Sequence, residues 1–189
     1  MFHDWDSFFL LIGSAAGALI GLLFVVVTLT AGQERSSAQQ GQSVFITPTV
    51  FHFAMVMVFS AVALAPGLAT RTIGLLLGVC AVAALVNAIV VALRMFLRKA
   101  VQPPHWSDYW YYGAAPVVIY ALLVASAACV WPSATIAAYA VGVTLLLLLL
   151  LGIRNAWDLV TWIAPRAADL AAPPPSDTSP VGQDGPRSS

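Results

Sequence analysis

The chain has 189 residues, of which 60% are hydrophobic and only 8% are charged, whereas water-soluble domains have about 45–50% apolar and about 25% charged residues. This composition excludes a water-soluble globule and a disordered chain, and it predicts an all-α polytopic membrane protein whose main partner is the lipid bilayer. Eight basic residues balance eight acidic ones, so there is no basic surplus to bind nucleic acid.

Five apolar stretches are long enough to cross the hydrocarbon layer, because about 20 residues of helix span it. Every Asp, Glu, Lys and Arg lies outside them, as expected when a charge at the bilayer centre is costly. Thr47 and Pro48 are predicted to start the second span as N-cap and first helical residue, and Pro132-Ser133 to divide the last two, for which a re-entrant pair is the alternative. The predicted spans are residues 8–31, 48–66, 72–93, 114–131 and 134–152.

The segments after the fifth span are predicted to lie outside the hydrocarbon. Residues 154–164 place apolar side chains at helical spacing beside charged ones, which indicates an amphipathic interfacial helix on the cytoplasmic side. The predicted helical bundle therefore comprises residues 1–165. Residues 166–189 are rich in Pro, Ser and Asp and are predicted to form a disordered tail.

The distribution of basic residues predicts the orientation. With five spans, Arg71 is the one basic residue on the side of the N-terminus, and seven lie on the other side: Arg35, Arg94, Arg98, Lys99, Arg154, Arg166 and Arg187. By the positive-inside rule the N-terminus lies outside and the C-terminus in the cytoplasm. Because the first span follows Asp4 and Asp6 and no basic residue, it is expected to be retained and not cleaved as a secretory signal. Predicted interfacial anchors are Trp106, Trp110, Trp157 and Trp162.

Small residues recur at four-residue spacing in two spans. Gly13, Gly17 and Gly21 share one face of the first span, and Gly74 and Gly78 share a face of the third. Such stripes let transmembrane helices approach closely. They predict either a homo-oligomer interface or packing between helices of one subunit.

Polar residues gather at the predicted inner end of the spans. They predict a polar vestibule open to the cytoplasm, formed by Thr28, His52, Asn87, Arg94, Asn155 and Asp158. The alternatives are that His52 is a neutral imidazole bonded to a neighbouring helix, that Asn87 makes an interhelical hydrogen bond, and that Asp158 pairs with Arg154 or Arg94 at the rim.

No sequence signature of an enzyme is present. Motifs for zinc proteases, serine hydrolases and nucleotide binding are absent. His3 and His105 are expected on opposite faces of the membrane, so they cannot join His52 around a metal, and Cys80 and Cys129 lie in apolar runs. We therefore expect no catalytic residues, no metal and no cofactor.

Two segments, WDSFFLLIGSAAGALIGLLFVVVTL and GIRNAWDLVTWIAP, are similar to parts of small bacterial multi-pass inner-membrane proteins. The resemblance implies a bacterial inner-membrane location and brings no activity or site residue with it.

Two functions fit these observations. The first is a small oligomeric pore or transporter for an ion or small solute. The second is an accessory or scaffold subunit of another membrane complex, with the segment around Trp157 and Asp158 as its docking surface. An intramembrane enzyme fits less well, because no catalytic pair is present.

Overall fold

The computed structural model describes residues 3–31, 39–97 and 109–171, and within them the chain is helical without a strand. Because a backbone in lipid must satisfy its hydrogen bonds internally, apolar runs of this length form helices. The elements, in chain order, are η1 (His3–Trp5), α1 (Asp6–Ala31), α2 (Gln39–Ala63), α3 (Thr70–Leu97), the π-helix η3 (Tyr109–Ala114), α5 (Ala115–Ala128) and α6 (Ala134–Ala171).

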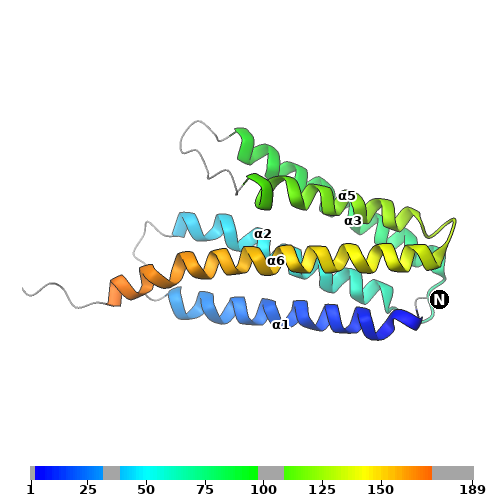
Figure 1. The fold of residues 1–189 in the computed structure, drawn as a ribbon, viewed down its shortest axis with the longest axis horizontal. Helices are drawn as coiled ribbons and strands as arrows, with labels where there is room; N and C mark the ends of the chain where they lie inside the picture. Colours follow the sequence, from blue (N-terminus) through cyan, green and yellow to red (C-terminus); the bar gives the residue numbers. More distant parts are fainter. Residues whose placement is uncertain (1–2, 32–38, 98–108, 172–189) are drawn as a thin grey trace, which may run out of the picture.

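The helices run alternately up and down in one bundle (Figure 1). The main packing pairs are α1 with α2 and α3 with α5, and α6 packs on both α2 and α5. The start of α1, the turn between α2 and α3 and the turn between α5 and α6 lie at one end of the bundle. The ends of α1, α3 and α6 and the starts of α2 and η3 lie at the other, called here the α6-terminal end, where α3 and α5 lean away from α2 and α6.

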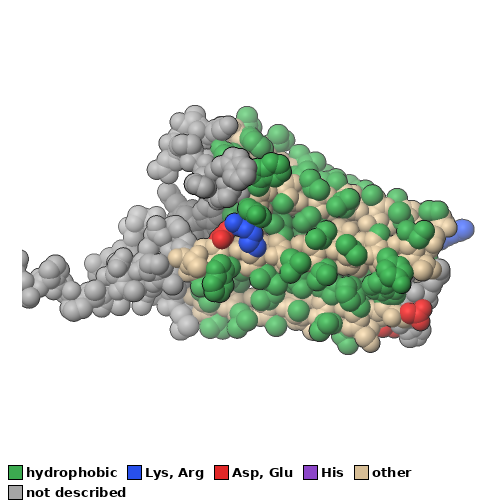
Figure 2. Space-filling model, in the orientation of Figure 1, with side chains coloured by type: hydrophobic (Ala, Val, Ile, Leu, Met, Phe, Trp, Pro, Cys, Tyr) green, Lys and Arg blue, Asp and Glu red, His purple; other side chains and the backbone are tan. Residues whose placement is uncertain are grey.

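Four helices in the described residues are long and apolar enough to cross a membrane: Asp6–Thr28, Thr70–Leu97, Tyr109–Ala128 and Ala134–Thr161. Helix α2 contributes a shorter apolar part, Pro48–Ala63. Apolar side chains cover the middle of the visible face, and the charged side chains that are seen lie toward the two ends (Figure 2). Such continuous apolar surface is rare on soluble monomers and suits a protein embedded in lipid.

The core between the helices is apolar and tightly closed. Phe53 and Val56 of α2, Leu77 of α3, Leu123 of α5 and Leu145 of α6 are all 0–1% exposed. Glycines allow the closest helix contacts, since a Cβ on Gly152 would lie 2.6 Å from the Phe53 ring and one on Gly74 would lie 2.8 Å from Val130. The close approach of α2 to α6 and of α3 to the residues that follow α5 therefore requires glycine, which has no side chain, at these two positions.

Two predicted boundaries differ in the structure. Helix α2 begins at Gln39, so Pro48 is inside the helix and is not its first residue. A proline there removes one helical hydrogen bond, yet α2 continues through it. Helix α6 is continuous from Ala134 to Ala171, so residues 154–164 prolong the fifth apolar helix instead of forming a separate one, and the helix passes the predicted start of the tail at residue 166. Residues 172–189 lie outside the described part.

Two short turns join helices at the end opposite the α6-terminal end. Helix α2 ends at Ala63, and Gly67 follows with a φ of +74°, a conformation that favours glycine. Between α5 and α6, the Ser133 hydroxyl accepts a hydrogen bond from the Ile136 N–H at 3.4 Å, as expected of an N-cap residue.

Candidate functional site: a polar cavity between α2, α3 and α5

A cavity of about 230 Å³ lies between α2, α3 and the η3–α5 segment. Its polar lining side chains are His52 from α2, Asn87 and Arg94 from α3, and Tyr112 from η3. Its apolar walls are formed by Pro48, Phe51, Ala88, Val91 and Pro116. This is called the polar cavity below. Three residues of the predicted vestibule, from two different helices, thus line a single space.

His52 is held by a tyrosine of a neighbouring helix. Its side chain is only 4% exposed, and its Nδ1 lies 2.9 Å from the hydroxyl of Tyr120 on α5, which is itself fully buried. The other ring nitrogen, Nε2, is buried without a hydrogen-bond partner among the described residues. An unpaired buried polar atom costs about 1–3 kcal/mol, so Nε2 is an unsatisfied hydrogen-bonding group in a residue that lines the polar cavity.

Asn87 and Arg94 extend the cavity to the protein surface. Both side chains are exposed on α3, and they lie seven positions apart in sequence, about two helical turns, so they share a face with Asn87 roughly 10 Å deeper. Arg94 forms no ion pair with the acidic residues that the structure describes. It supplies the formal positive charge of the polar cavity.

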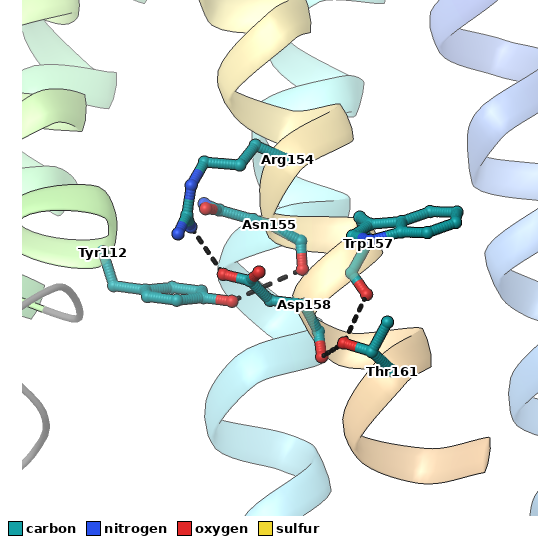
Figure 3. A network of polar contacts seen from close by, with 6 residues as sticks. All are labelled: Tyr112, Arg154, Asn155, Trp157, Asp158 and Thr161. Carbon is teal, nitrogen blue, oxygen red and sulfur yellow. Dashed lines mark hydrogen bonds and ion pairs between the residues drawn. The ribbon is translucent and has the colours of Figure 1, made fainter.

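The π-helix η3 places Tyr112 between the cavity and α6. The Tyr112 side chain is 7% exposed, and its hydroxyl donates a hydrogen bond to the backbone carbonyl of Asn155 at 3.4 Å (Figure 3). The Asn155 side chain is fully buried, and neither its Oδ1 nor its Nδ2 has a partner within the described ranges. A carboxamide left unpaired in a packed core is unusual. Together with Nε2 of His52, it is a second buried polar group without a described hydrogen-bond partner.

An ion pair lies beside this cluster on the surface of α6. Arg154 donates a hydrogen bond to Asp158, one turn later, and both side chains are partly exposed (Figure 3). The guanidinium of Arg154 also lies 3.3 Å from the centre of the Tyr111 ring of η3, a cation–π contact. These contacts fasten η3 to α6 at the edge of the cavity.

Not every residue of the predicted vestibule lines the cavity. Thr28 is exposed on α1, and its hydroxyl bonds to the carbonyl of Val25 in the same helix at 2.9 Å. Asn155 does not line the cavity, and only its backbone carbonyl contacts a lining residue, Tyr112. Asp158 pairs with Arg154 instead of Arg94. Of the predicted anchors, Trp110 is 55% and Trp157 is 70% exposed, whereas Trp106 and the side chain of Trp162 lie outside the described residues.

The glycine stripes face partners within this chain at most positions. A Cβ on Gly13 would lie 2.9 Å from Ser60 of α2, and one on Gly17 would lie 3.4 Å from the sulfur of Met57. Gly74 faces Val130, and Gly78 is near Ala127 at 3.9 Å, while Gly21 has open space around it. Gly74 and Gly78 also line an apolar groove of about 560 Å³ between α3 and α5.

Two tyrosines were not singled out for the vestibule by the sequence. Tyr112 lies just before the predicted span of residues 114–131, and Tyr120 lies in the apolar run of that span. The available signal for Tyr120 was that a hydroxyl within a span needs a hydrogen-bond partner. Its pairing with His52, 68 positions away in sequence, depends on how α5 is rotated and could not be read from spacing.

Comparison of the chain with protein-family models, with curated proteins and with solved structures finds no match. The site is therefore interpreted from its own chemistry. No group of three His, Cys, Asp or Glu side chains that could hold a metal occurs in the described part of the chain. The polar cavity offers hydrogen-bond donors, one cation and apolar walls, an arrangement suited to binding a small solute.

Proposed function

We propose that the protein is a small transporter-like bundle that binds a polar or charged solute in the polar cavity. The observation that carries this proposal is the convergence of His52, Asn87 and Arg94 on one space of about 230 Å³. Polar and ionisable groups within membrane helices are expensive and mark solute pathways. The unpartnered Nε2 of His52 adds a buried polar atom with no structural bond to explain it.

The closed core favours a transporter over a permanently open pore through one chain. Beyond His52, toward the turns at the opposite end, the described interior is filled by Leu77, Leu123 and Leu145, each 0–1% exposed. A solute that enters at the α6-terminal end would need a rearrangement of helices to pass. The α3–α5 pair (Figure 1) is the proposed moving unit, because it is joined to α1 and α2 mainly through the packing of α5 on α6.

The proposal includes a membrane topology. In it α2 is the fifth crossing, since it runs antiparallel to α1 and α3 within the same bundle (Figure 1). The segment that contains residues 154–164 lies at the inner membrane surface, with the N-terminus outside and the C-terminus in the cytoplasm of a bacterial cell. The polar cavity then opens to the cytoplasm. Support comes from the excess of basic residues on that side of the chain.

Self-association is part of the proposal as well. Gly13 and Gly17 pack against α2 of the same chain and are not available to a second copy. The surface of α1 that remains available consists of Gly21 and the exposed apolar side chains of that helix. The open position of Gly21 allows another helix to approach closely.

Flux through reconstituted vesicles tests the proposed function. We expect uptake of a small polar solute by vesicles that contain the protein, and loss of most of this uptake in Asn87→Leu, which removes a polar lining group with little change in volume. The matched control is Val86→Leu, the adjacent exposed residue of α3, which should transport like the parent. Absence of uptake for anionic, cationic and neutral solutes alike, with correctly folded protein, would contradict the proposal.

One observation favours the alternative of an accessory subunit. Trp157 is 70% exposed on α6 beside the Arg154–Asp158 pair, and exposed tryptophans are frequent anchors in protein interfaces. If this is the main function, a membrane partner should co-purify in mild detergent and be lost in Trp157→Ala. A change confined to detergent or lipid behaviour would instead identify Trp157 as an interfacial anchor.

A further inference from the structure

The described residues that line the polar cavity carry one sign of charge. Arg94 is its charged lining residue, and no described carboxylate lines it. The nearest acidic side chain described on α6, Asp158, is already paired with Arg154, while Asp4 and Asp6 belong to the start of the chain, at the opposite end of the bundle. A cation in this space would meet a guanidinium that no described carboxylate neutralises, whereas an anion would be attracted to it.

The remaining polar groups also suit an anion. The Asn87 amide can donate hydrogen bonds into the cavity, whereas the proton of the Tyr112 hydroxyl is already given to the Asn155 carbonyl. An anion favours the tautomer of His52 in which Nδ1 accepts from the Tyr120 hydroxyl and Nε2 carries the proton and can donate it in a hydrogen bond. The buried Nε2, which has no partner in the described residues, then gains one.

The walls and the volume narrow the class of anion. Phe51, Val91 and Pro116 give the cavity an apolar side, which fits a short hydrocarbon chain. Its volume of about 230 Å³ is below the range of about 300–1,000 Å³ usual for drug-sized ligands. A single guanidinium presents two parallel donors that match a carboxylate, and it cannot neutralise a dianion.

We infer that the polar cavity binds a small monocarboxylate, with Arg94 as its counter-charge near the surface and His52 and Asn87 as neutral donors deeper inside. This inference rests on the proposed function, because it names the solute class of the same cavity. Because the charged group lies near the surface and the neutral donors lie deeper, the carboxylate would first bind at Arg94. It would then move toward His52, where the weaker neutral donors allow its release.

Binding of propionate to the full chain in nanodiscs of zwitterionic lipid tests the inference. The comparison solutes are propionamide, which is neutral, propylammonium, which is a cation, and inorganic phosphate. We expect propionate to bind and the other three to bind much more weakly. In Arg94→Gln the affinity for propionate should fall about tenfold to a hundredfold, the range expected for losing charged hydrogen bonds.

Two further variants of α3 keep the result interpretable. Arg71→Gln removes the arginine at the other end of the same helix, outside the cavity, and should bind propionate like the parent. Arg94→Lys keeps the positive charge but loses the planar guanidinium, which donates two parallel hydrogen bonds. Its affinity for propionate should lie between those of the parent and of Arg94→Gln. Circular dichroism and size-exclusion profiles that match the parent verify that each variant folds.

The outcomes separate the inference from the function on which it rests. Equal binding of propionamide or propylammonium, tighter binding of phosphate, or equal losses in Arg71→Gln and Arg94→Gln would overturn the monocarboxylate assignment. If vesicle uptake of another solute persists in those cases, the proposed function stands. Failure of every solute both to bind and to be taken up would overturn both.

Discussion

The contact between Gly152 and Phe53 offers a test of how α2 sits in the bundle. A methyl group at Gly152 would lie 2.6 Å from Cε1 and 3.0 Å from Cζ of the Phe53 ring. The ring cannot swing outward, because Phe53 is 0% exposed. Overpacking of this kind costs about 1–3 kcal/mol, and the better helix propensity of alanine returns at most about 1 kcal/mol. We expect Gly152→Ala to lower the free energy of unfolding by roughly 1–2 kcal/mol.

Reversible unfolding in mixed detergent micelles, followed by circular dichroism, measures this change. Gly78→Ala is the matched control, because the nearest atom to the added methyl group is the Cβ of Ala127 at 3.9 Å, an ordinary contact. Its stability should equal that of the parent or exceed it by up to about 1 kcal/mol through helix propensity. A smaller ring partner should relieve the clash, so adding Phe53→Leu to Gly152→Ala should cost less than the sum of the two single changes. If Gly152→Ala is as stable as Gly78→Ala, the described packing of α2 against α6 is wrong.

Three other changes probe the polar contacts. Tyr120→Phe leaves Nδ1 of His52 buried without its partner, so stability measured in the same assay should fall by about 1–3 kcal/mol; an unchanged value would show that the pair does not form. Asn155→Leu removes a carboxamide with no described partner and should raise stability while lowering solute uptake, as expected where function retains an unfavourable polar group; lower stability together with unchanged uptake would contradict this. Arg154→Gln removes a partly exposed pair with Asp158 and should cost no more than about 1 kcal/mol; a loss several times larger would mean that the pair is buried in the membrane-embedded protein.

The sequence predicted the helices where charge and length decide them. The apolar runs beginning near residues 8, 72 and 134 match helices that are apolar enough to cross a membrane, because ionised groups are excluded from such runs. Pro132 and Ser133 marked the turn before α6 correctly, since proline ends one helix and serine caps the next.

Helix boundaries in polar stretches could not be predicted in the same way. Hydropathy detects where a span becomes apolar, and α2 instead continues backward through polar residues to Gln39. Likewise, the helix that contains Arg154 and Asp158 shows amphipathic spacing whether or not it is joined to the preceding span. Their one-turn pair (Figure 3) fits either case, and the continuity is seen only in the structure, where α6 runs from Ala134 to Ala171.

The candidate site was partly accessible to sequence reasoning. Topology alone places His52, Asn87 and Arg94 toward the same end of the bundle, and the structure brings these three together around one cavity. Topology does not determine how each helix is rotated about its axis. The pairing of His52 with Tyr120 and the separation of Thr28 from the cavity follow from that rotation.

The central claim is that a polar cavity between α2, α3 and α5 is open to water from one side of a membrane-embedded bundle. It can be tested by thiol labelling in sealed vesicles, using Asn87→Cys in a chain whose two native cysteines are replaced by Cys80→Ala and Cys129→Ala. We predict that a membrane-impermeant maleimide labels position 87 only from the side that carries the C-terminus, and that Val86→Cys in the same background is not labelled. Absence of labelling at position 87 from both sides, in protein that is folded, would contradict the claim.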